Sequence, residues 1–523
     1  MALHPPTPLR ARLAWVGLLL VLAVPLWWGA HASFPWDLDN IAPGSVLKAM
    51  AARFGPGWYS SYGPVPYLLT AFVYAPLLAL MRLAGELGRP AAAYPFGFRH
   101  PEASITALVV AARLVTLALA LGLAALAACT TRVAPRAAAE RRPGARPWLV
   151  PVLLAGSAVF VYYARTSNVD LHALFWAWLA FALVETPAPS LARCAGAAAA
   201  AALAVCSKEQ LAPFAAVAGL VACARAWAPG APGRRRGAGA VALVLAAGLA
   251  AYALVWMLPL NLPGWLAHHR FLFETAKYPR TFAATLEGYG ALARRCFELA
   301  PLAFGWPVLL GLVAAVMTRP GLRGLGPRAL GAALYLAAFI GSIGYVYPRF
   351  LLPLLLLVLP IALRGLEAAL GRMGPRGGVA LAGALVVLAL AGGPALDLVM
   401  LQDPRLVVER WLATRAPAGA LVEIAGNPHF QARVPATRRR LVTSPDSLRL
   451  RPRDPAGDVV LVSSLDEYAL RRLPGDAYLR ALETGDAYRL ELEAHPPALA
   501  RLFEGLPVAP EVRVYVRAAA VSP

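Results

Sequence analysis

Charged residues are scarce in this sequence. Asp, Glu, Lys and Arg make up 15% of the 523 residues, whereas 59% are hydrophobic, and a water-soluble protein needs a larger charged share to solvate its surface. Apolar runs of roughly 16 to 28 residues recur from Leu13 almost to Met400, close to the length of about 20 with which a helix crosses a bilayer. The composition excludes an ordinary soluble protein and predicts an all-α polytopic membrane bundle.

Cysteine is also rare. The chain has five cysteines: Cys129, Cys194, Cys206, Cys223 and Cys296. Four of them lie in or beside apolar runs. They show no CxxC motif and no paired spacing, so we expect neither a disulfide framework nor a zinc site.

Acidic residues are few compared with basic ones. The chain has 28 Asp and Glu against 49 Lys and Arg, a net charge of +21. The basic residues are dispersed in short links between apolar runs and do not gather on one soluble surface. We therefore expect no nucleic-acid partner, and we use the basic residues as indicators of membrane topology.

Long apolar runs are absent after Gln402. We therefore divide the chain into a membrane domain, 1–400, and a small mixed α/β domain, 401–523, which is long enough to fold as one soluble unit. Val407, Val408, Trp411 and Leu412 give residues Arg405 to Arg415 a helical apolar pattern. Three segments have the composition of strands: Leu421 to Ile424, Val459 to Val462 and Val512 to Val516. This domain contains no catalytic motif.

The basic links indicate how the chain is threaded, because short cytoplasmic loops concentrate Lys and Arg. The strongest links are Arg132 to Arg146, then Arg234 to Arg236, then Arg319, Arg323 and Arg328, then Arg364, Arg372 and Arg376. The run from Pro64 to Ala84 decides the count, since it is long enough to span but contains several prolines. If it spans, the first basic link falls outside and the pattern fails. If it lies along the outer surface, or dips in and returns, every basic link falls inside, and we adopt this interpretation.

The resulting topology has about eleven spans with the C-terminal domain outside. The predicted spans are Leu13 to Trp28, Ser104 to Cys129, Trp148 to Tyr163, Val169 to Val184, Leu191 to Cys206, Leu211 to Trp227, Val241 to Pro259, Leu299 to Met317, Ala329 to Val346, Leu351 to Leu363 and Val379 to Val399. The first run could instead be a cleaved signal peptide, since Ala30-His31-Ala32 imitates a cleavage site. We favour a retained helix, because its end leads into a loop with functional features.

The first outer loop, 31–103, carries carboxylates directly after the first helix. Asp37 and Asp39 could each act as a general base that removes a proton from a hydroxyl group of a substrate. Asp39 could instead cap a short helix that starts near Ile41. The two aspartates could also share a divalent cation, although an Asp-x-Asp pair alone is a weak signal.

Four cationic residues are predicted to reach the outer face. They are Arg113, Arg165, Lys208 and Arg349, and charges in or beside spanning helices are costly enough to be functional candidates. Arginine suits bidentate contact with phosphate. The alternatives are that Arg113 and Lys208 extend their charged ends to the membrane surface without binding anything.

Polar and aromatic neighbours of these cations are candidates for substrate binding. They are Tyr62, Asn168, Asp170, Glu209, Gln210 and Tyr347. Asn168 or Asp170 could instead simply cap the next helix.

The long outer loop, 261–298, is interpreted as an amphipathic element that covers a bound lipid. The alternative is a solvated loop. His268 and His269 are adjacent in this loop, so they point in different directions on a helix and make a poor metal pair.

Taken in order, these features resemble the GT-C superfamily of polyprenyl-phosphate-sugar-dependent glycosyltransferases, particularly its protein O-mannosyltransferase-like and aminoarabinose-transferase-like bacterial members. The resemblance spans Leu13 to about Leu363. It is carried by the aspartate-bearing first loop, Tyr62 to Tyr67, Phe98 to Pro101, Tyr163 to Asp170, Ser207 to Gln210 and Tyr347 to Pro353.

The resemblance implies inverting transfer of a sugar from a lipid-phosphate carrier, with an outer-loop carboxylate as base. Asp39 best matches the position of that carboxylate. Many relatives have Asp-Glu where this chain has Asp39-Asn40, which leaves Asp37 as a rival base and puts a two-carboxylate mechanism in doubt. The implied partners are membrane lipid, a polyprenyl-phosphate sugar and an acceptor that the sequence does not identify; no cofactor is implied with certainty. The implied location is the bacterial plasma (inner) membrane. The alternatives from other classes are a lipid or solute transporter or flippase, and a non-catalytic scaffold.

Overall fold

The computed structural model of the chain describes residues 9–31, 35–37, 41–130, 146–227, 237–275, 279–322, 324–435, 438–450, 454–472 and 477–518. The chain forms two compact units. One comprises Met1–Leu26 with Asp39–Pro394 and is called the membrane unit below; the other comprises Trp27–Leu38 with Ala395–Pro523 and is called the C-terminal unit.

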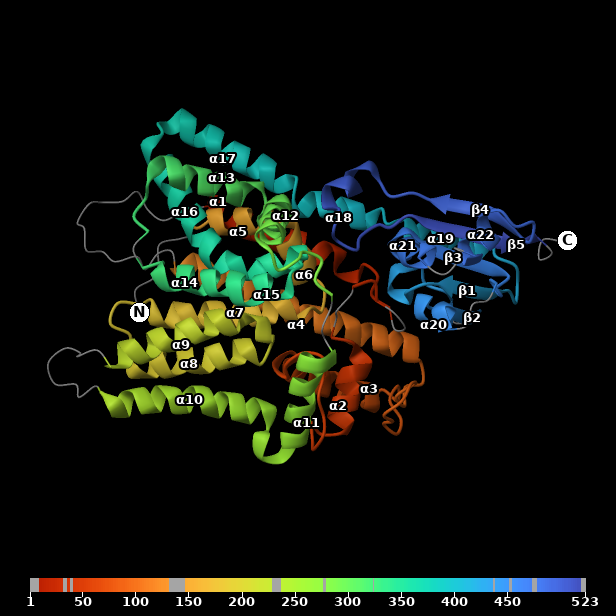
Figure 1. The fold of residues 1–523 in the computed structure, drawn as a ribbon, viewed down its shortest axis with the longest axis horizontal. Helices are drawn as coiled ribbons and strands as arrows, with labels where there is room; N and C mark the ends of the chain where they lie inside the picture. The colour runs from red at the N-terminus through yellow and green to blue at the C-terminus, as the bar shows by residue number, and fades with distance from the viewer. Residues whose placement is uncertain are drawn as a thin grey trace. The chain divides into compact units, whose positions relative to one another are not determined.

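The membrane unit is built from helices (Figure 1). In chain order these are α1 (Leu9–Ala23), η1 (Val24–Trp27), α2 (Pro43–Ala51), α3 (Val65–Leu83), α4 (Pro101–Thr130), α5 (Leu149–Ala155), α6 (Ala158–Ala164), α7 (Val169–Val184), α8 (Leu191–Val205), η3 (Glu209–Leu211), α9 (Ala212–Trp227), α10 (Ala238–Trp256), α11 (Leu258–Arg270), η4 (Phe271–Thr275), α12 (Leu286–Phe304), α13 (Trp306–Thr318), α14 (Gly326–Tyr335), η5 (Leu336–Ile340), α15 (Gly341–Ile343), η6 (Pro348–Leu354), α16 (Leu355–Arg372) and α17 (Pro375–Leu390).

The helices confirm the predicted polytopic membrane bundle. Within the described residues, 8 helices, α3 among them, are long and apolar enough to cross a bilayer, or up to 9 if α12 and α13, bent by 113° at their junction, count as one span. Two of the predicted spans, α7 and α8, are apolar but shorter. Short spans are tolerated where neighbouring helices shelter their ends.

At least two predicted spans are not continuous helices. Leu299 to Met317 is divided at Gly305 between α12 and α13, and Trp148 to Tyr163 is also divided. Residues Trp148 to Tyr163 form α5 and α6, separated by Gly156 and Ser157. The Ser157 hydroxyl accepts a hydrogen bond from the Phe160 N–H (3.1 Å), which caps α6. A Cβ atom added at Gly305 or at Gly392 would overlap the Gly156 carbonyl. The prediction of one helix over 148–163 is wrong because the backbone at Gly305 and at Gly392 packs against this turn. The sequence of residues 148–163 alone does not show that these distant segments pack there.

Within the described residues, three of the basic links lie together at one end of the membrane unit: those at Arg146, at 319–328 and at 364–376. Three contacts join them: Arg372 Nη2 to Thr318 O (2.7 Å), Arg364 Nη1 to Gly321 O (3.1 Å) and Arg146 Nη2 to Leu370 O (3.4 Å). At the same end Arg328 forms a bidentate ion pair with Glu185, with N–O distances of 2.6 and 2.7 Å. We call this the basic end; the shared position is what the positive-inside pattern predicts.

Helix α3 lies toward the opposite end. Its first residue, Val65, donates its N–H to Cys206 O (3.1 Å), where α8 has run away from the basic end. Farther along α3, the Tyr74 hydroxyl donates to Leu108 O (2.7 Å) in the early part of α4. Because Leu108 precedes the end of α4 at Thr130 by 22 residues, this contact is about 33 Å along α4 from the basic end. Helix α3 therefore starts and packs away from the basic links (Figure 1), which supports the non-crossing interpretation.

The C-terminal unit contains a five-stranded mixed sheet in the order β2-β1-β3-β5-β4. The strands are β1 (Leu421–Ala425), β2 (Arg439–Thr443), β3 (Val459–Ser463), β4 (Tyr488–Ala494) and β5 (Val512–Arg517). Strand β1 pairs in parallel with β2 and β3, while β5 pairs antiparallel with β3 and β4. Along β3, Val459 and Leu461 belong to one hydrophobic core cluster, and Val460 and Val462 to another. This alternation means that the sheet is buried on both faces.

Short helices accompany this sheet: α18 (Gly393–Leu401), α19 (Pro404–Thr414), η7 (Pro428–Phe430), α20 (Pro445–Leu450), α21 (Ser464–Arg471), α22 (Ala477–Glu483) and η9 (Ala498–Phe503). The predicted mixed α/β fold, its first helix and its three predicted strands are confirmed. The segment Trp27–Leu38 also belongs to this unit. Its Trp28 indole donates to Asp403 (3.0 Å), and its Trp36 indole donates to Gln431 O (2.9 Å).

Candidate functional site

The centre of the candidate site is a buried ion pair in the membrane unit. Lys208 follows α8, and its Nζ lies 2.7 Å from Asp170 Oδ1 in the first turn of α7. Gln210 Nε2 donates to the same oxygen, also at 2.7 Å. Only 11% of the Lys208 side chain and 1% of the Asp170 side chain are exposed. Burial of a charge is tolerated when it is paired and hydrogen-bonded, so this arrangement fixes both charged groups in place.

The turn before α7 explains why Asp170 points at Lys208. Asn168 is the N-cap of α7, and its side chain accepts a hydrogen bond from the Asp170 N–H (2.8 Å). The capping alternative is thus correct for Asn168, as expected for an Asn before an apolar helix. Asp170 does not cap; its carboxylate is free to accept from the Ser207–Gln210 segment.

Aromatic rings surround the ammonium group of Lys208. It lies 5.5 Å from the ring centroid of Tyr62 and 5.9 Å from that of Phe350. The neighbouring Arg349 guanidinium lies 5.7 Å from the Tyr347 ring and 5.5 Å from the Phe350 ring. Cations over aromatic faces within about 6 Å are favourable, more so where water is excluded. Phe350 therefore joins the Lys208 pair to Arg349 and Tyr347.

A second buried contact adds the long outer loop to this cluster. His268 of α11 is fully buried; its Nε2 lies 2.7 Å from Glu209 Oε1 and its Nδ1 lies 2.8 Å from Ser60 O. Both ring nitrogens of His268 thus lie at hydrogen-bond distance from oxygen atoms of two other segments. The sequence predicted His268 only as part of a covering element. The contact with Glu209 was missed because it joins segments 59 residues apart, which no local pattern reveals.

Arg113 and Arg165 lie against the first helix. Arg113 Nη1 donates to Leu26 O (2.7 Å), and Arg165 Nη1 approaches Val21 O (3.5 Å). Both side chains are buried. Cationic groups near the last carbonyls of a helix stabilise its C-terminus. These two arginines thus have a structural role in addition to the phosphate contact predicted for them.

The two candidate bases are placed differently by the structure. Asp37 is buried in the segment that packs with the C-terminal unit. Asp39 and Asn40 lie outside the described residues. The next described residue, Ile41, belongs to the membrane unit and donates its N–H to Ser167 O (2.8 Å), in the turn before Asp170. The assignment of the base and the shared divalent cation stay predictions.

No protein-family model matches the chain, and no curated protein matches it. Comparison with solved structures returns ArnT from Cupriavidus metallidurans bound to undecaprenyl phosphate, with 15% identity, a TM-score of 0.43, and coverage of 97% of this chain and 99% of that one. It also returns oligosaccharyltransferase AglB from Archaeoglobus fulgidus in complex with an inhibitory peptide and a dolichol-phosphate, with 12% identity, a TM-score of 0.42, and coverage of 98% and 89%.

A third match is the S. cerevisiae protein O-mannosyltransferase Pmt1-Pmt2 complex bound to the sugar donor, with 18% identity, a TM-score of 0.30, and coverage of 54% of this chain and 36% of that one. These structures fall in the superfamily that the sequence motifs resemble.

Proposed function

We propose that the protein is an inverting glycosyltransferase that moves a sugar from a polyprenyl-phosphate carrier to an acceptor hydroxyl at the outer face of the membrane. One observation carries the proposal: polar segments scattered between Ser60 and Phe350 meet in one cluster, away from the basic end of the unit, around the buried side chains of Asp170, Lys208, Gln210 and His268. These segments hold Tyr62, Asp170, Lys208, Glu209, Gln210, His268, Tyr347 and Arg349. Buried charge of this kind in a membrane protein is a functional candidate by default.

The chemistry follows from the charges in the cluster. The acceptor oxygen attacks the anomeric carbon as the bond from that carbon to the phosphate oxygen breaks, and the bonding electron pair leaves with the phosphate. Lys208 and Arg349 are positioned to stabilise the charge that develops on the phosphate, and fixed cations do so most effectively where water is excluded. Arg113 and Arg165 are further predicted phosphate ligands.

The sugar would be recognised by the remaining groups. Asp170 uses only one of its oxygens for Lys208 and Gln210; among the described residues, its Oδ2 atom has no hydrogen-bond partner. A buried carboxylate oxygen without a donor is costly, and a sugar hydroxyl would supply that donor. Tyr62, Glu209, Gln210 and Tyr347 line the same cluster, and Asn168 holds Asp170 in position.

Asp39 would accept the proton of the acceptor hydroxyl. In the sequence Asp39 precedes Ile41 by two residues, and Ile41 is hydrogen-bonded to the turn that leads into Asp170. Asp37, the rival base, precedes Ile41 by four residues.

The proposed location is the bacterial plasma membrane with the C-terminal unit outside. Helix α17 starts at Pro375, directly after Arg372 at the basic end, and the membrane unit ends at Pro394. If the basic end is cytoplasmic, as the excess of arginine there predicts, the chain leaves the membrane unit on the outer side.

The test uses purified full-length protein, lipid-phosphate carriers with labelled sugars and a panel of acceptors. Asp39→Asn should abolish transfer while expression and donor binding persist, because only the proton acceptor is removed. Asp37→Asn is the matched control and should retain transfer. An active Asp39→Asn variant with an inactive Asp37→Asn variant would show that the base is Asp37. Carrier movement across vesicles without transfer by the wild type would replace the proposal with a flippase.

A further inference from the structure

The β4–β5 ribbon of the C-terminal unit places four polar side chains on one face. The register pairs Glu493 with Arg513 and Ala494 with Val512, so the next residues in the two directions, His495 and Glu511, face each other just beyond the ladder. Residues two apart on a strand share a face, and directly opposed residues have Cβ atoms about 4.5–5.5 Å apart. Glu493, His495, Glu511 and Arg513 therefore form the corners of a compact square.

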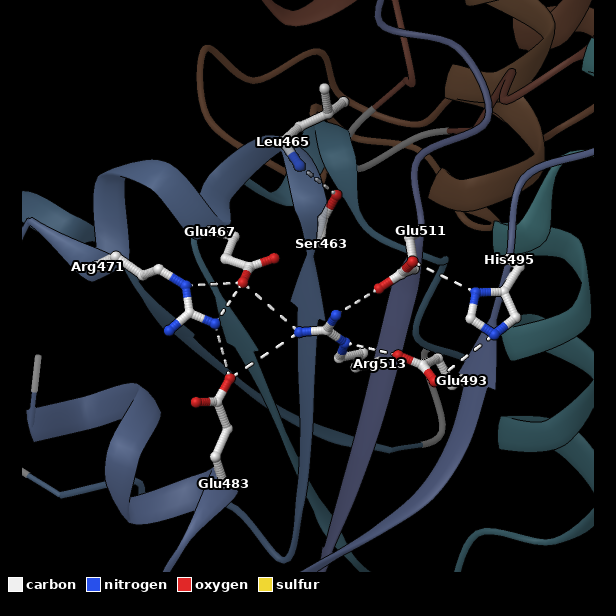
Figure 2. A network of polar contacts seen from close by, with 9 residues as sticks. All are labelled: Ser463, Leu465, Glu467, Arg471, Glu483, Glu493, His495, Glu511 and Arg513. Carbon is white, nitrogen blue, oxygen red and sulfur yellow. Dashed lines mark hydrogen bonds and ion pairs between the residues drawn. The ribbon is translucent and has the colours of Figure 1, made fainter. Parts of the chain in front are cut away.

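Arg513 orients both carboxylates of this square. Its Nε donates to Glu493 Oε1 (2.9 Å), and its Nη2 lies 2.7 Å from Glu511 Oε1. The second oxygen of each carboxylate faces His495: Glu511 Oε2 lies 3.3 Å from Nδ1 and Glu493 Oε2 lies 3.6 Å from Nε2. Figure 2 shows the imidazole between the two carboxylates, on the side away from the guanidinium. Outer groups that hold carboxylates in this way are typical of metal ligands.

The backbone at both ends of this square is restrained. Pro496 and Pro497 follow His495, and Pro510 precedes Glu511. Proline fixes its own φ angle and restricts the residue before it, so Pro496 restricts the backbone of His495. Ser464 also donates its N–H to Glu511 O (2.9 Å). The side chains are thus carried by a rigid frame although they are partly exposed.

The surrounding network carries surplus negative charge. Arg513 is also 3.6 Å from Glu467 and 3.9 Å from Glu483, and Arg471 binds both of these residues. The network in Figure 2 therefore holds four carboxylates and two guanidinium groups, a formal charge of −4 + 2 = −2 when His495 is neutral. The chain as a whole has a net charge of +21, so this local negative charge is unusual. A divalent cation bound in the network would neutralise the local charge of −2.

We propose that Glu493, His495 and Glu511 bind one zinc-class divalent metal ion. One ligand atom from each residue can be chosen so that all three lie within 4.8 Å of one another. Ligands of a tetrahedral zinc ion lie about 3.4 Å apart, from bond lengths of about 2.0–2.1 Å. Rotation of the imidazole, whose side chain is 62% exposed, brings one nitrogen to both Oε2 atoms. Water completes the coordination, as in three-ligand zinc sites.

The ligand set favours zinc over magnesium or calcium. The hard cations prefer oxygen ligands, with six or more in their coordination shell, whereas imidazole suits zinc and neighbouring transition ions. The bound ion would join the end of β4 to the start of β5 and so close the connection 495–511. This site is distinct from the Asp37/Asp39 pair and uses no cysteine.

The test is a zinc titration of the full-length protein in detergent, with any affinity tag removed and a chromophoric chelator as competitor. The wild type should bind one zinc ion tightly. His495→Gln and Glu493→Gln should each weaken that site on the order of 100-fold, because even outer-shell changes cost about 10- to 100-fold. Circular dichroism should show unchanged folding, since the altered side chains are partly exposed.

Two controls separate a metal site from general negative charge. Glu483→Gln removes a carboxylate from the network without removing a ligand, and Glu491→Gln removes one from the same strand, where it pairs with Arg489. Both should bind zinc with affinity within about 3-fold of the wild type. The proposal is overturned if the wild type lacks a tight site, if His495→Gln leaves it unchanged, or if Glu483→Gln weakens it as much as Glu493→Gln does.

Discussion

Each unit of the molecule contains a buried aspartate paired with a cation, but the two carboxylates are satisfied to different degrees. In the C-terminal unit, Asp403 accepts hydrogen bonds from the N–H, Nε and Nη2 of Arg405, from the Trp28 indole and from the Ala509 N–H. The side chains of Asp403 and Arg405 are both fully buried. Every acceptor position that the carboxylate offers is used within the protein, so this pair serves the fold.

In the membrane unit, Asp170 has both of its side-chain hydrogen bonds on one oxygen. Lys208 and Gln210 donate to Oδ1, while Oδ2 has no partner within the described residues. Native structures satisfy most buried polar groups, and an exception calls for a functional explanation. The comparison therefore distinguishes a carboxylate that stabilises a domain from one that is arranged for a ligand.

The largest effect should come from breaking the saturated pair. Asp403→Asn leaves the buried Arg405 guanidinium without a counter-charge, which costs about 3–5 kcal/mol for a buried pair. We expect the C-terminal unit to open far more readily. Hydrogen exchange of residues 421–425 and 459–463, followed by mass spectrometry, measures this opening.

The control for this variant is Asp486→Asn, an exposed position in the same unit, for which we expect a change below about 0.5 kcal/mol. If the Asp403→Asn and Asp486→Asn variants exchange their amide hydrogens equally slowly, the full set of hydrogen bonds to Asp403 does not stabilise the unit.

The next effect concerns activity. Asp170→Asn removes the charge that holds Lys208 and weakens the acceptor for a sugar hydroxyl, so we expect kcat/KM for sugar transfer to fall on the order of 100-fold, or about 2.7 kcal/mol. Steady-state turnover of a labelled lipid-phosphate sugar checks this value.

The matched control is Glu185→Gln. It removes one charge from the buried pair with Arg328 at the basic end of the same unit, and it should lower stability while leaving kcat/KM per folded molecule unchanged. A similar loss of kcat/KM in both variants would mean that Asp170 acts through stability alone.

Much of the membrane unit was predictable because its signals are local. Runs of apolar residues mark the helices, and arginines in the connecting links mark one end of the bundle. The non-crossing interpretation of the proline-containing run from Pro64 to Ala84 was chosen because it puts every basic link on one side, and the contacts of Val65 and Tyr74 support it.

Features that depend on distant contacts could not be predicted. The break at Ser157 exists because Gly305 and Gly392 approach it, and the His268–Glu209 contact joins two separate loops. Strands β2 and β4 were missed because they are the edges of the sheet. Edge strands carry exposed polar side chains, so they lack the apolar runs by which β1, β3 and β5 were recognised.

Asp466 is a third buried carboxylate, and it has no cationic partner among the described residues. Its Oδ1 accepts from the Asn427 N–H (3.0 Å), while Oδ2 has no partner within the described residues. Burial raises the pKa of Asp466 to about 7 from its usual 3.8, although hydrogen bonds from Asn427 and Gln431 lower it. Below about pH 7 this carboxyl group would therefore hold a proton, whereas Asp403 is satisfied by donors of the protein.

The smallest effect follows from this pKa and depends on pH. Between about pH 4 and 7 the folded chain retains a proton on Asp466 that the unfolded chain has lost, so the free energy of unfolding falls as the pH rises. From pH 5.5 to 8 the linkage predicts a fall of about 2 kcal/mol. Asp466→Asn keeps an oxygen for the Asn427 N–H and removes the titration, so the fall should vanish. Hydrogen exchange of residues 426–431, corrected for intrinsic rates, measures both chains, and parallel pH profiles would show that Asp466 is ionised in the folded protein.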